Sequence, residues 1–141
     1  MTQAPAPVFR LALRVYWEDT DAAGIVFYAN FLKFFERART EWLRTKGYSQ
    51  EQLRTERGTG FIVTDASISY RRPARLDDLL DVTVALTRIG QASLQIAQQA
   101  SRIVPDGTNE LLADGTIRIG CVELGTYRPR RIPTEILQSI Q

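Results

Sequence analysis

A cluster of carboxylates stands directly ahead of the strongest helical pattern in the sequence. Glu18, Asp19 and Asp21 are followed by Gly24 and by an apolar run that leads into a helix expected from about Asn30. The free N–H groups and the positive dipole end of a helix N-terminus attract carboxylates and stabilise a developing anion. One carboxylate beside such donors is the minimum needed to hydrolyse an activated carbonyl. The alternative is that these acids only cap the helix.

The residue types that are missing narrow the chemistry further. The sequence contains no histidine and one cysteine, Cys121. This composition excludes Ser–His–acid and Cys–His nucleophiles, and zinc sites built from imidazole or paired thiolates. Gly58 and Gly60 lack the further glycine and the preceding strand that a phosphate-binding loop needs. Any catalysis must therefore use carboxylates, hydroxyls, basic side chains or backbone amides.

Size and charge set the broad class of the protein. The 141 residues are 44% apolar, which suffices for one domain with an ordinary core. The 18 basic and 16 acidic residues leave a net charge of +2, which gives no reason to expect a nucleic-acid partner. Residues 1–8 are expected to form a loose tail rather than a signal peptide, and no stretch has the length of a membrane span. Together with the single cysteine, these features predict a cytoplasmic protein without membrane insertion.

The helices are predicted from apolar residues that recur every three or four positions. The long helix is expected over residues 30–46, with Gly47 placed to end it. Its apolar stripe consists of Phe31, Phe34, Phe35, Ala38, Trp42 and Leu43. Ser49 is expected to cap a short helix that ends near Arg57, and residues 134–140 are expected to form another.

Alternation with a period of two predicts the strands. They are expected over residues 10–16, 61–70, 81–89, 93–104 and 111–124. The second strand is expected to place on one face Ile62, Thr64, Ala66, Ile68 and Tyr70, and on the other Phe61, Val63, Asp65, Ser67 and Ser69. In the fourth strand, Gln95, Gln98 and Gln99 are expected to face solvent or a second subunit. This order of elements predicts an α+β fold, in which a five-stranded antiparallel sheet wraps one long central helix and leaves edges that a dimer could pair.

The acidic segment also resembles a known family. Residues 18–31 read EDTDAAGIVFYANF and continue as KFFERARTE over residues 33–41. This run is similar to that of the hot-dog-fold acyl-CoA thioesterases, in the branch that contains 4-hydroxybenzoyl-CoA thioesterase and the YbgC-type enzymes. A second, less specific match is YRRPARLDD at residues 70–78. The resemblance spans roughly residues 10–130.

The resemblance implies a hot-dog fold, a homodimer or dimer of dimers with active sites at the subunit interface, and no metal or prosthetic group. Asp21 matches the catalytic aspartate of the family, as a nucleophile or as a general base to water. Tyr28 matches the residue whose backbone N–H points at the thioester carbonyl. Many YbgC-type relatives carry histidine at this position. The tyrosine of this chain departs from them and resembles the hydroxybenzoyl-CoA type instead. Asp19 and Glu18 are expected to be turn-forming or surface acids.

Further residues are expected around the substrate. Gly24 would let the backbone approach it, or would serve a plain turn. The apolar residues after it are expected to bind the substrate, namely Ile25, Val26, Phe27 and Phe31. Glu36 matches an acidic position near the acyl group in the family, although a solvated helix glutamate is the alternative. Arg71 and Arg88 belong to basic clusters that suit the phosphates of coenzyme A, or are scattered solvated arginines.

These features together predict an enzyme that hydrolyses the thioester of a small aromatic or short-chain acyl-CoA to the free acid and CoA. The alternative is a non-catalytic hot-dog module that binds CoA or a protein, such as an adaptor in an envelope-associated complex. Hydrolysis of acyl-CoA by the purified protein would decide between the two.

Overall fold

The computed structural model describes residues 5–141, so part of the predicted tail lies outside the described residues. The chain forms, in order, β1 (Phe9–Arg14), the short 3₁₀ helix η1 (Trp17–Asp19), α1 (Asn30–Thr45), α2 (Gln50–Arg57), β2 (Thr59–Tyr70), β3 (Leu79–Ile89), β4 (Ser93–Ile103), β5 (Asn109–Glu123) and α3 (Thr134–Ile140). Every predicted helix and strand is present. Among these residues, no helix is both long enough and apolar enough to cross a bilayer.

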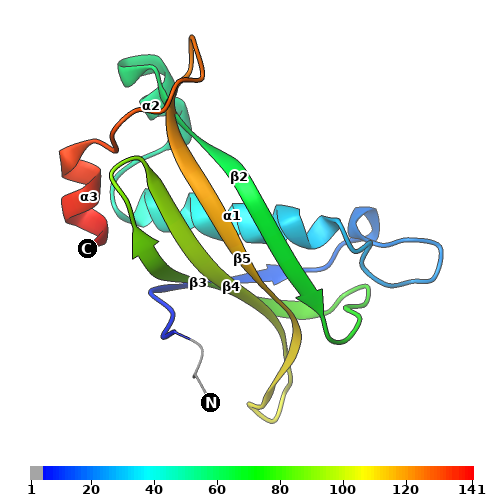
Figure 1. The fold of residues 1–141 in the computed structure, drawn as a ribbon. Coiled ribbons are helices and arrows are strands. Elements are labelled where there is room, and N and C mark those ends of the chain that lie inside the picture. Colours follow the sequence, from blue (N-terminus) through cyan, green and yellow to red (C-terminus); the bar gives the residue numbers. More distant parts are fainter. Residues whose placement is uncertain (1–4) are drawn as a thin grey trace.

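The five strands form one antiparallel sheet in the order β1-β3-β4-β5-β2. The long helix α1 runs behind this sheet and across its strands (Figure 1). Its apolar stripe packs on the facing sheet surface, where Phe34 and Phe35 are completely buried with Val82 and Val84 of β3. Burial of one such aromatic side chain contributes about 1.5–3 kcal/mol to folding. The predicted α+β architecture of one central helix wrapped by a five-stranded sheet is confirmed.

A β-bulge divides β2 into two halves. Val63 pairs with Ile119 of β5, but the next pair is Asp65 with Arg118, so Thr64 is an extra residue. An extra residue shifts the two-residue alternation by one. The residues that pack toward α1 and the core are therefore Phe61 before the bulge, and Ile68 and Tyr70 after it. The predicted single alternation through all of residues 61–70 is wrong for this reason.

Gln98 is the second departure from the expected pattern. Its side chain is 1% exposed and faces α1 rather than solvent or a second subunit. Its Nε2 donates to the carbonyls of Phe35 (3.1 Å) and Thr83 (3.2 Å), and its Oε1 accepts from Arg39 (2.9 Å). With every polar atom paired, the amide is tolerated beneath the sheet. Burial lowers the pKa of Arg39, and the nearby Glu36 carboxylate acts in the opposite direction.

Candidate active site

The acidic segment folds into a tight loop between β1 and α1. Thr20 and Val26 form an antiparallel bridge, and the N–H of Asp21 donates to the carbonyl of Ile25 (2.9 Å). Gly24 closes the turn with φ of +78°, a backbone conformation that glycine adopts without strain. The loop therefore carries Asp21 alongside the strand-like segment that leads to Tyr28.

Asp21 is exposed, and its Oδ1 accepts a hydrogen bond from the N–H of Ala23 (2.8 Å). This local bond fixes the carboxylate at the turn. Asp19 is different, because it is 3% exposed and both of its carboxylate oxygens accept hydrogen bonds. The expectation of a turn-forming acid is confirmed for Asp19, which bonds back to the N–H of Tyr16, but Asp19 is not on the surface. Glu18 is exposed, as expected.

The start of α1 presents backbone donors next to this loop. The N–H groups of Asn30, Phe31 and Leu32 turn back to carbonyls three residues earlier. Within residues 5–141, the N–H groups of Tyr28 and Ala29 find no acceptor. Unpaired N–H groups at a helix N-terminus are the donors that suit an anion or a polarised carbonyl oxygen.

A hollow of about 280 Å³ opens beside these donors. Its wall consists of Ile25, Val26, Tyr28, Phe31, Tyr70, Arg71, Arg72 and Pro73. The hydroxyl of Tyr70 donates to the carbonyl of Tyr28 (2.8 Å), and the Tyr70 ring lies edge-on to the rings of Tyr28 and Phe31. Burial and the neighbouring Tyr28 hydroxyl raise the pKa of Tyr70, so it remains a neutral donor. The hollow is therefore walled in part by three aromatic residues, Tyr28, Phe31 and Tyr70.

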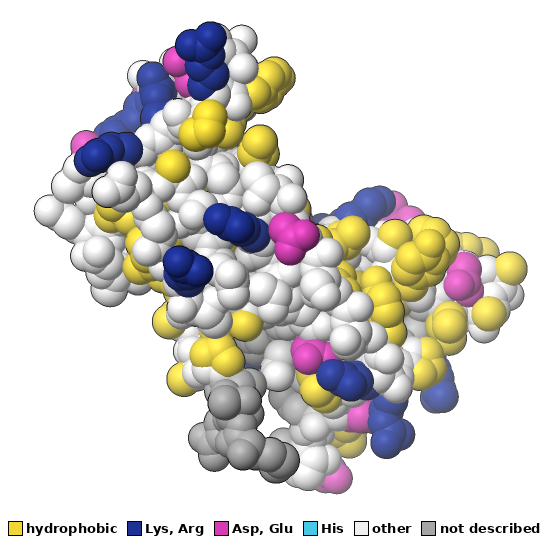
Figure 2. Space-filling view, in the orientation of Figure 1, with side chains coloured by type: hydrophobic (Ala, Val, Ile, Leu, Met, Phe, Trp, Pro, Cys, Tyr) yellow, Lys and Arg dark blue, Asp and Glu magenta, His cyan; other side chains and the backbone are white. Residues whose placement is uncertain are grey.

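Exposed apolar side chains gather at this end of the molecule. Tyr16, Trp17, Phe27 and Tyr28 each expose about half or more of their surface. Figure 2 shows hydrophobic side chains concentrated over the end that carries this loop, whereas the visible sheet surface has few charges. A large apolar exposure at one end is typical of a surface that binds a ligand or another chain.

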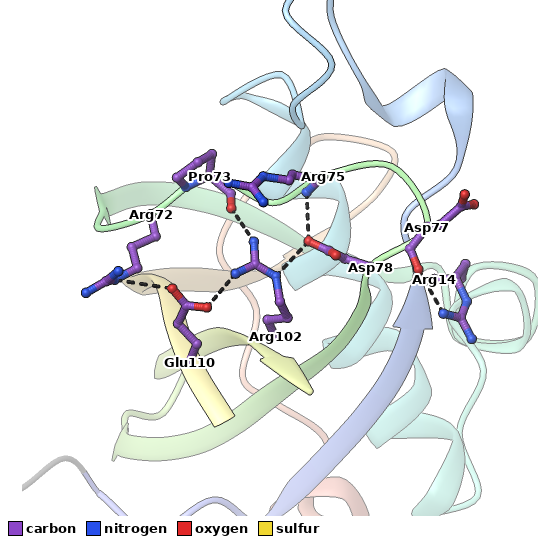
Figure 3. A network of polar contacts seen from close by, with 8 residues as sticks. All are labelled: Arg14, Arg72, Pro73, Arg75, Asp77, Asp78, Arg102 and Glu110. Carbon is purple, nitrogen blue, oxygen red and sulfur yellow. Dashed lines mark hydrogen bonds and ion pairs between the residues drawn. The ribbon is translucent and has the colours of Figure 1, made fainter. Parts of the chain in front are cut away.

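The segment between β2 and β3 forms the far wall of the hollow, and Arg102 of β4 holds it in place. The Arg102 guanidinium donates to Asp78 (2.8 Å), to Glu110 (2.5 Å) and to the carbonyl of Pro73 (2.6 Å). Figure 3 shows these acceptors arranged around the guanidinium. The same segment binds the loop before α1, because the N–H of Val26 donates to the carbonyl of Ala74 (2.8 Å).

The structure brings most of the predicted site residues together. Ile25, Val26, Phe31 and Arg71 share the hollow with Tyr28. Asp21 does not line the hollow in the single chain and lies in the adjacent turn, as does Gly24. Phe27 lies next to the hollow, with its ring centroid 4.9 Å from that of Tyr28.

Two predicted residues lie elsewhere in the single chain. Glu36 is exposed and lines a separate hollow of about 370 Å³ between α1, β2 and α3. Arg88 pairs with Gln95 near the other end of the sheet, a separation on the order of 20 Å from Tyr70 by strand spacing. Their substrate contacts stay predictions.

The candidate phosphate-binding arginines already have carboxylate partners. Arg71 binds Asp114 (2.9 Å), whose hydrogen bond raises the pKa of Arg71, and Arg72 binds Glu110 (3.3 Å). Both arginines are more than half exposed, so their outer N–H groups face solvent at the mouth of the hollow. Among residues 5–141, no group of three acidic or cysteine side chains is arranged to hold a metal ion.

Comparison with known proteins identifies the family. A profile described as the thioesterase-like superfamily matches residues 15–140. The chain belongs to the thioesterase-like superfamily. The predicted family and its hot-dog fold are confirmed, and so is the prediction that the protein is a thioester hydrolase.

Individual thioesterases resemble the chain over nearly its whole length. It is 41% identical to the acyl-CoA thioester hydrolase YbgC of Escherichia coli O6:H1, over 92% of this chain and 93% of that protein. It is 39% identical to the acyl-CoA thioesterase YbgC of Haemophilus influenzae, over 91% and 90%. A solved variant of 4-hydroxybenzoyl-CoA thioesterase complexed with 4-hydroxybenzoyl-CoA has the same fold, with a TM-score of 0.84 and 22% identity over 94% of this chain and 97% of that one.

Sequence reasoning missed several residues that this thioesterase fold places around the loop. Tyr70 begins the second motif, but the assumed alternation gave no sign that its hydroxyl reaches Tyr28. Asn30 lies within the first motif, and its bond to Asp19 could not be read from an isolated polar residue at a helix start. Arg102 carried no signal, since an arginine in a strand is ordinarily a solvated side chain.

Proposed function

We propose that the protein hydrolyses acyl-CoA to the free acid and CoA, with Asp21 as the catalytic carboxylate and the N–H of Tyr28 as the donor to the thioester carbonyl. One observation carries this proposal. The backbone of Asp21 pairs with Ile25 in the loop whose return segment ends in the unpaired N–H groups of Tyr28 and Ala29, and Tyr28 borders an aromatic hollow. The exposed carboxylate of Asp21 accepts from the N–H of Ala23 in the same loop.

The proposed reaction uses few groups. The thioester oxygen accepts from the Tyr28 N–H, which stabilises the negative charge that develops when the carbonyl carbon is attacked. Asp21 either attacks that carbon itself, which releases the CoA thiolate and leaves a mixed anhydride for water to hydrolyse, or takes a proton from an attacking water. In both versions the carbon–sulfur bond breaks and one water is consumed. One aimed donor of this kind typically contributes about 100-fold or more to the rate.

The proposed substrates carry a small aromatic or short-chain acyl group. The hollow of about 280 Å³ is walled by the rings of Tyr28, Phe31 and Tyr70, and aromatic rings stack favourably edge-to-face. The similar solved thioesterase that carries 4-hydroxybenzoyl-CoA supports the same class. Arg71 at the mouth would bind a phosphate of CoA through its outward N–H groups, while Asp114 holds the inner ones.

We propose that the working form is a homodimer or a dimer of dimers in the cytoplasm. Within the described part of the chain, β2 is an edge strand that pairs only with β5. An edge of 12 residues is a ready template for another strand. Val63 on this strand and Tyr28 beside it are exposed apolar residues that a second copy would cover.

A thiol-release assay tests the proposal. Purified protein is given benzoyl-, 4-hydroxybenzoyl-, acetyl-, butyryl- and palmitoyl-CoA, and kcat and KM are measured for each. We expect turnover with the aromatic or short acyl groups, and a loss of about 100-fold or more in kcat for Asp21→Asn. Glu18→Gln, which changes an exposed acid of the same loop, is the matched control and should keep the parent rate. Parent-like turnover by Asp21→Asn would refute the assigned role, and CoA binding without hydrolysis would favour the non-catalytic module.

A further inference from the structure

We propose that Asp19 and Asn30 form a positioning pair that sets the distance between the Asp21 carboxylate and the Tyr28 N–H. This inference rests on the proposed function, because it assigns a role in positioning the same two groups. Neither Asp19 nor Asn30 touches the hollow beside Tyr28, so their effect on catalysis would be indirect.

The pair is buried and fully bonded. Asp19 and Asn30 are 3% and 7% exposed, and the Asn30 Nδ2 donates to Asp19 Oδ1 (2.9 Å). The other carboxylate oxygen accepts from the N–H of Tyr16 (2.8 Å). In the described residues no lysine or arginine pairs with Asp19, so these two donors are what satisfies the buried carboxylate. A carboxylate buried in this way is costly to leave without either donor.

The pair closes the loop that carries the proposed reacting groups. Asp21 follows Asp19 by two residues, and Tyr28 precedes Asn30 by two residues. The Asp19 carbonyl also accepts from the N–H of Phe27 (3.0 Å), so one residue is bonded to the chain before the loop, to its return segment and to the first turn of α1. Without the Asn30 bond, the loop loses this side-chain link to the first turn of α1 and keeps its backbone bonds, the last of them at Phe27.

Loss of the Asp19–Asn30 hydrogen bond should affect the rate of hydrolysis more than substrate binding. A misplacement of about 1 Å between reacting groups typically lowers a rate by about 100-fold. The aromatic wall and the arginines at the mouth are held by other bonds, between Tyr70 and Tyr28, between Arg71 and Asp114, and between Arg72 and Glu110. Loss of the pair should therefore lower kcat while KM stays nearly the same.

Asn30→Asp breaks the pair, because two carboxylates then face each other where a donor met an acceptor. We expect kcat to fall by about 10- to 100-fold, with KM changed by less than about threefold. Asn109→Asp, at an exposed asparagine at the start of β5, is the matched control and should behave like the parent. Thermal unfolding of each variant is measured at one fixed protein concentration.

The exchanged double variant Asp19→Asn with Asn30→Asp separates positioning from folding. Its amide oxygen can accept from the Tyr16 N–H as before, and its amide N–H can donate to the new carboxylate, so both hydrogen bonds are restored and only the one between positions 19 and 30 changes direction. We expect kcat to recover to within about threefold of the parent.

Two results would overturn the inference. One is an Asn30→Asp variant that keeps parent kcat, and the other is an exchanged variant that regains the parent melting temperature but not its kcat. The proposed function is judged separately by Asp21→Asn. If that variant is inactive while Asn30→Asp is fully active, the positioning pair fails and the proposed function stands.

Discussion

The hydrogen bonds of Arg102 permit a quantitative prediction about the wall of the hollow. Its side chain is only 19% exposed, and its guanidinium contacts two carboxylates and one carbonyl, from Asp78, Glu110 and Pro73. Desolvation is the largest influence on the pKa of Arg102 and lowers it, but the hydrogen bonds and charges of Asp78 and Glu110 together raise it. The folded state therefore favours the charged arginine.

Arg102→Gln removes this charge and most of its bonds. A hydrogen bond to a charged group contributes about 1.5–3 kcal/mol when buried, whereas a fully exposed ion pair contributes about 0–1 kcal/mol. In this variant Asp78 still accepts from the N–H of Arg75, and Glu110 still forms its ion pair with Arg72, so each carboxylate retains one partner. We expect a net loss of about 2–3 kcal/mol in the free energy of unfolding, which corresponds to about 6–10 °C in Tm for a chain of this length.

Urea and thermal unfolding at one protein concentration measure this loss. Arg118→Gln is the matched control, since Arg118 is an exposed strand arginine and none of its side-chain atoms forms a hydrogen bond or ion pair with residues 5–141. We expect the control to lie within about 0.5 kcal/mol of the parent. If Arg102→Gln is no less stable than Arg118→Gln, the guanidinium does not hold the 71–78 segment and the reasoning is refuted.

Three further predictions concern single side chains. Tyr70→Phe removes the hydrogen bond to the Tyr28 carbonyl. The loss of one such bond, about 1 kcal/mol, should lower kcat for the best substrate by about fivefold. An unchanged kcat would show that this bond does not support catalysis. Gly115→Ala should lower the free energy of unfolding by about 1–3 kcal/mol in urea titrations, because the new Cβ would lie 2.6 Å from the carbonyl oxygen of Ser67, and a parent-like midpoint would count against this crowding. Burial raises the pKa of the Cys121 thiol, so the unfolded thiol loses its proton first and stability should decline as pH rises above about 8.5. Mass-spectrometric alkylation at pH 8 should accordingly be slower for native than for urea-unfolded protein, and equal rates would disprove the protection.

The elements of the fold were predictable because their signals are local. The spacing of Phe31, Phe34 and Trp42 defines α1, and all three are buried as predicted. Ser49 caps α2 by accepting from the N–H of Gln52 (3.1 Å), which matches the expected cap. Periodicity and capping depend on residues within a few positions of one another, so a sequence states them directly.

The polar contacts of the site were not predictable because they join distant segments. The bulge at Thr64 depends on how β2 pairs with β5, and this pairing decides whether the Tyr70 side chain lies on the face of the sheet that packs on α1. The burial of Gln98 and Asp19 depends on partners 11 or more residues away. Polar residues with no local partner are ordinarily exposed, so their types alone pointed the wrong way.

The irregularity in β2 allows one strand to serve two hollows. Val63 contributes to the larger hollow beside Glu36, and Tyr70 to the smaller one beside Tyr28, although an odd and an even position of a regular strand would point to opposite sides. Because the two residues line different hollows, substitutions in residues 59–63 can change the shape of the larger hollow and leave the smaller one unchanged. A deletion of Thr64 would join the halves into one regular ladder that keeps Val63 and Tyr70 on the same face, so both spaces would keep their walls.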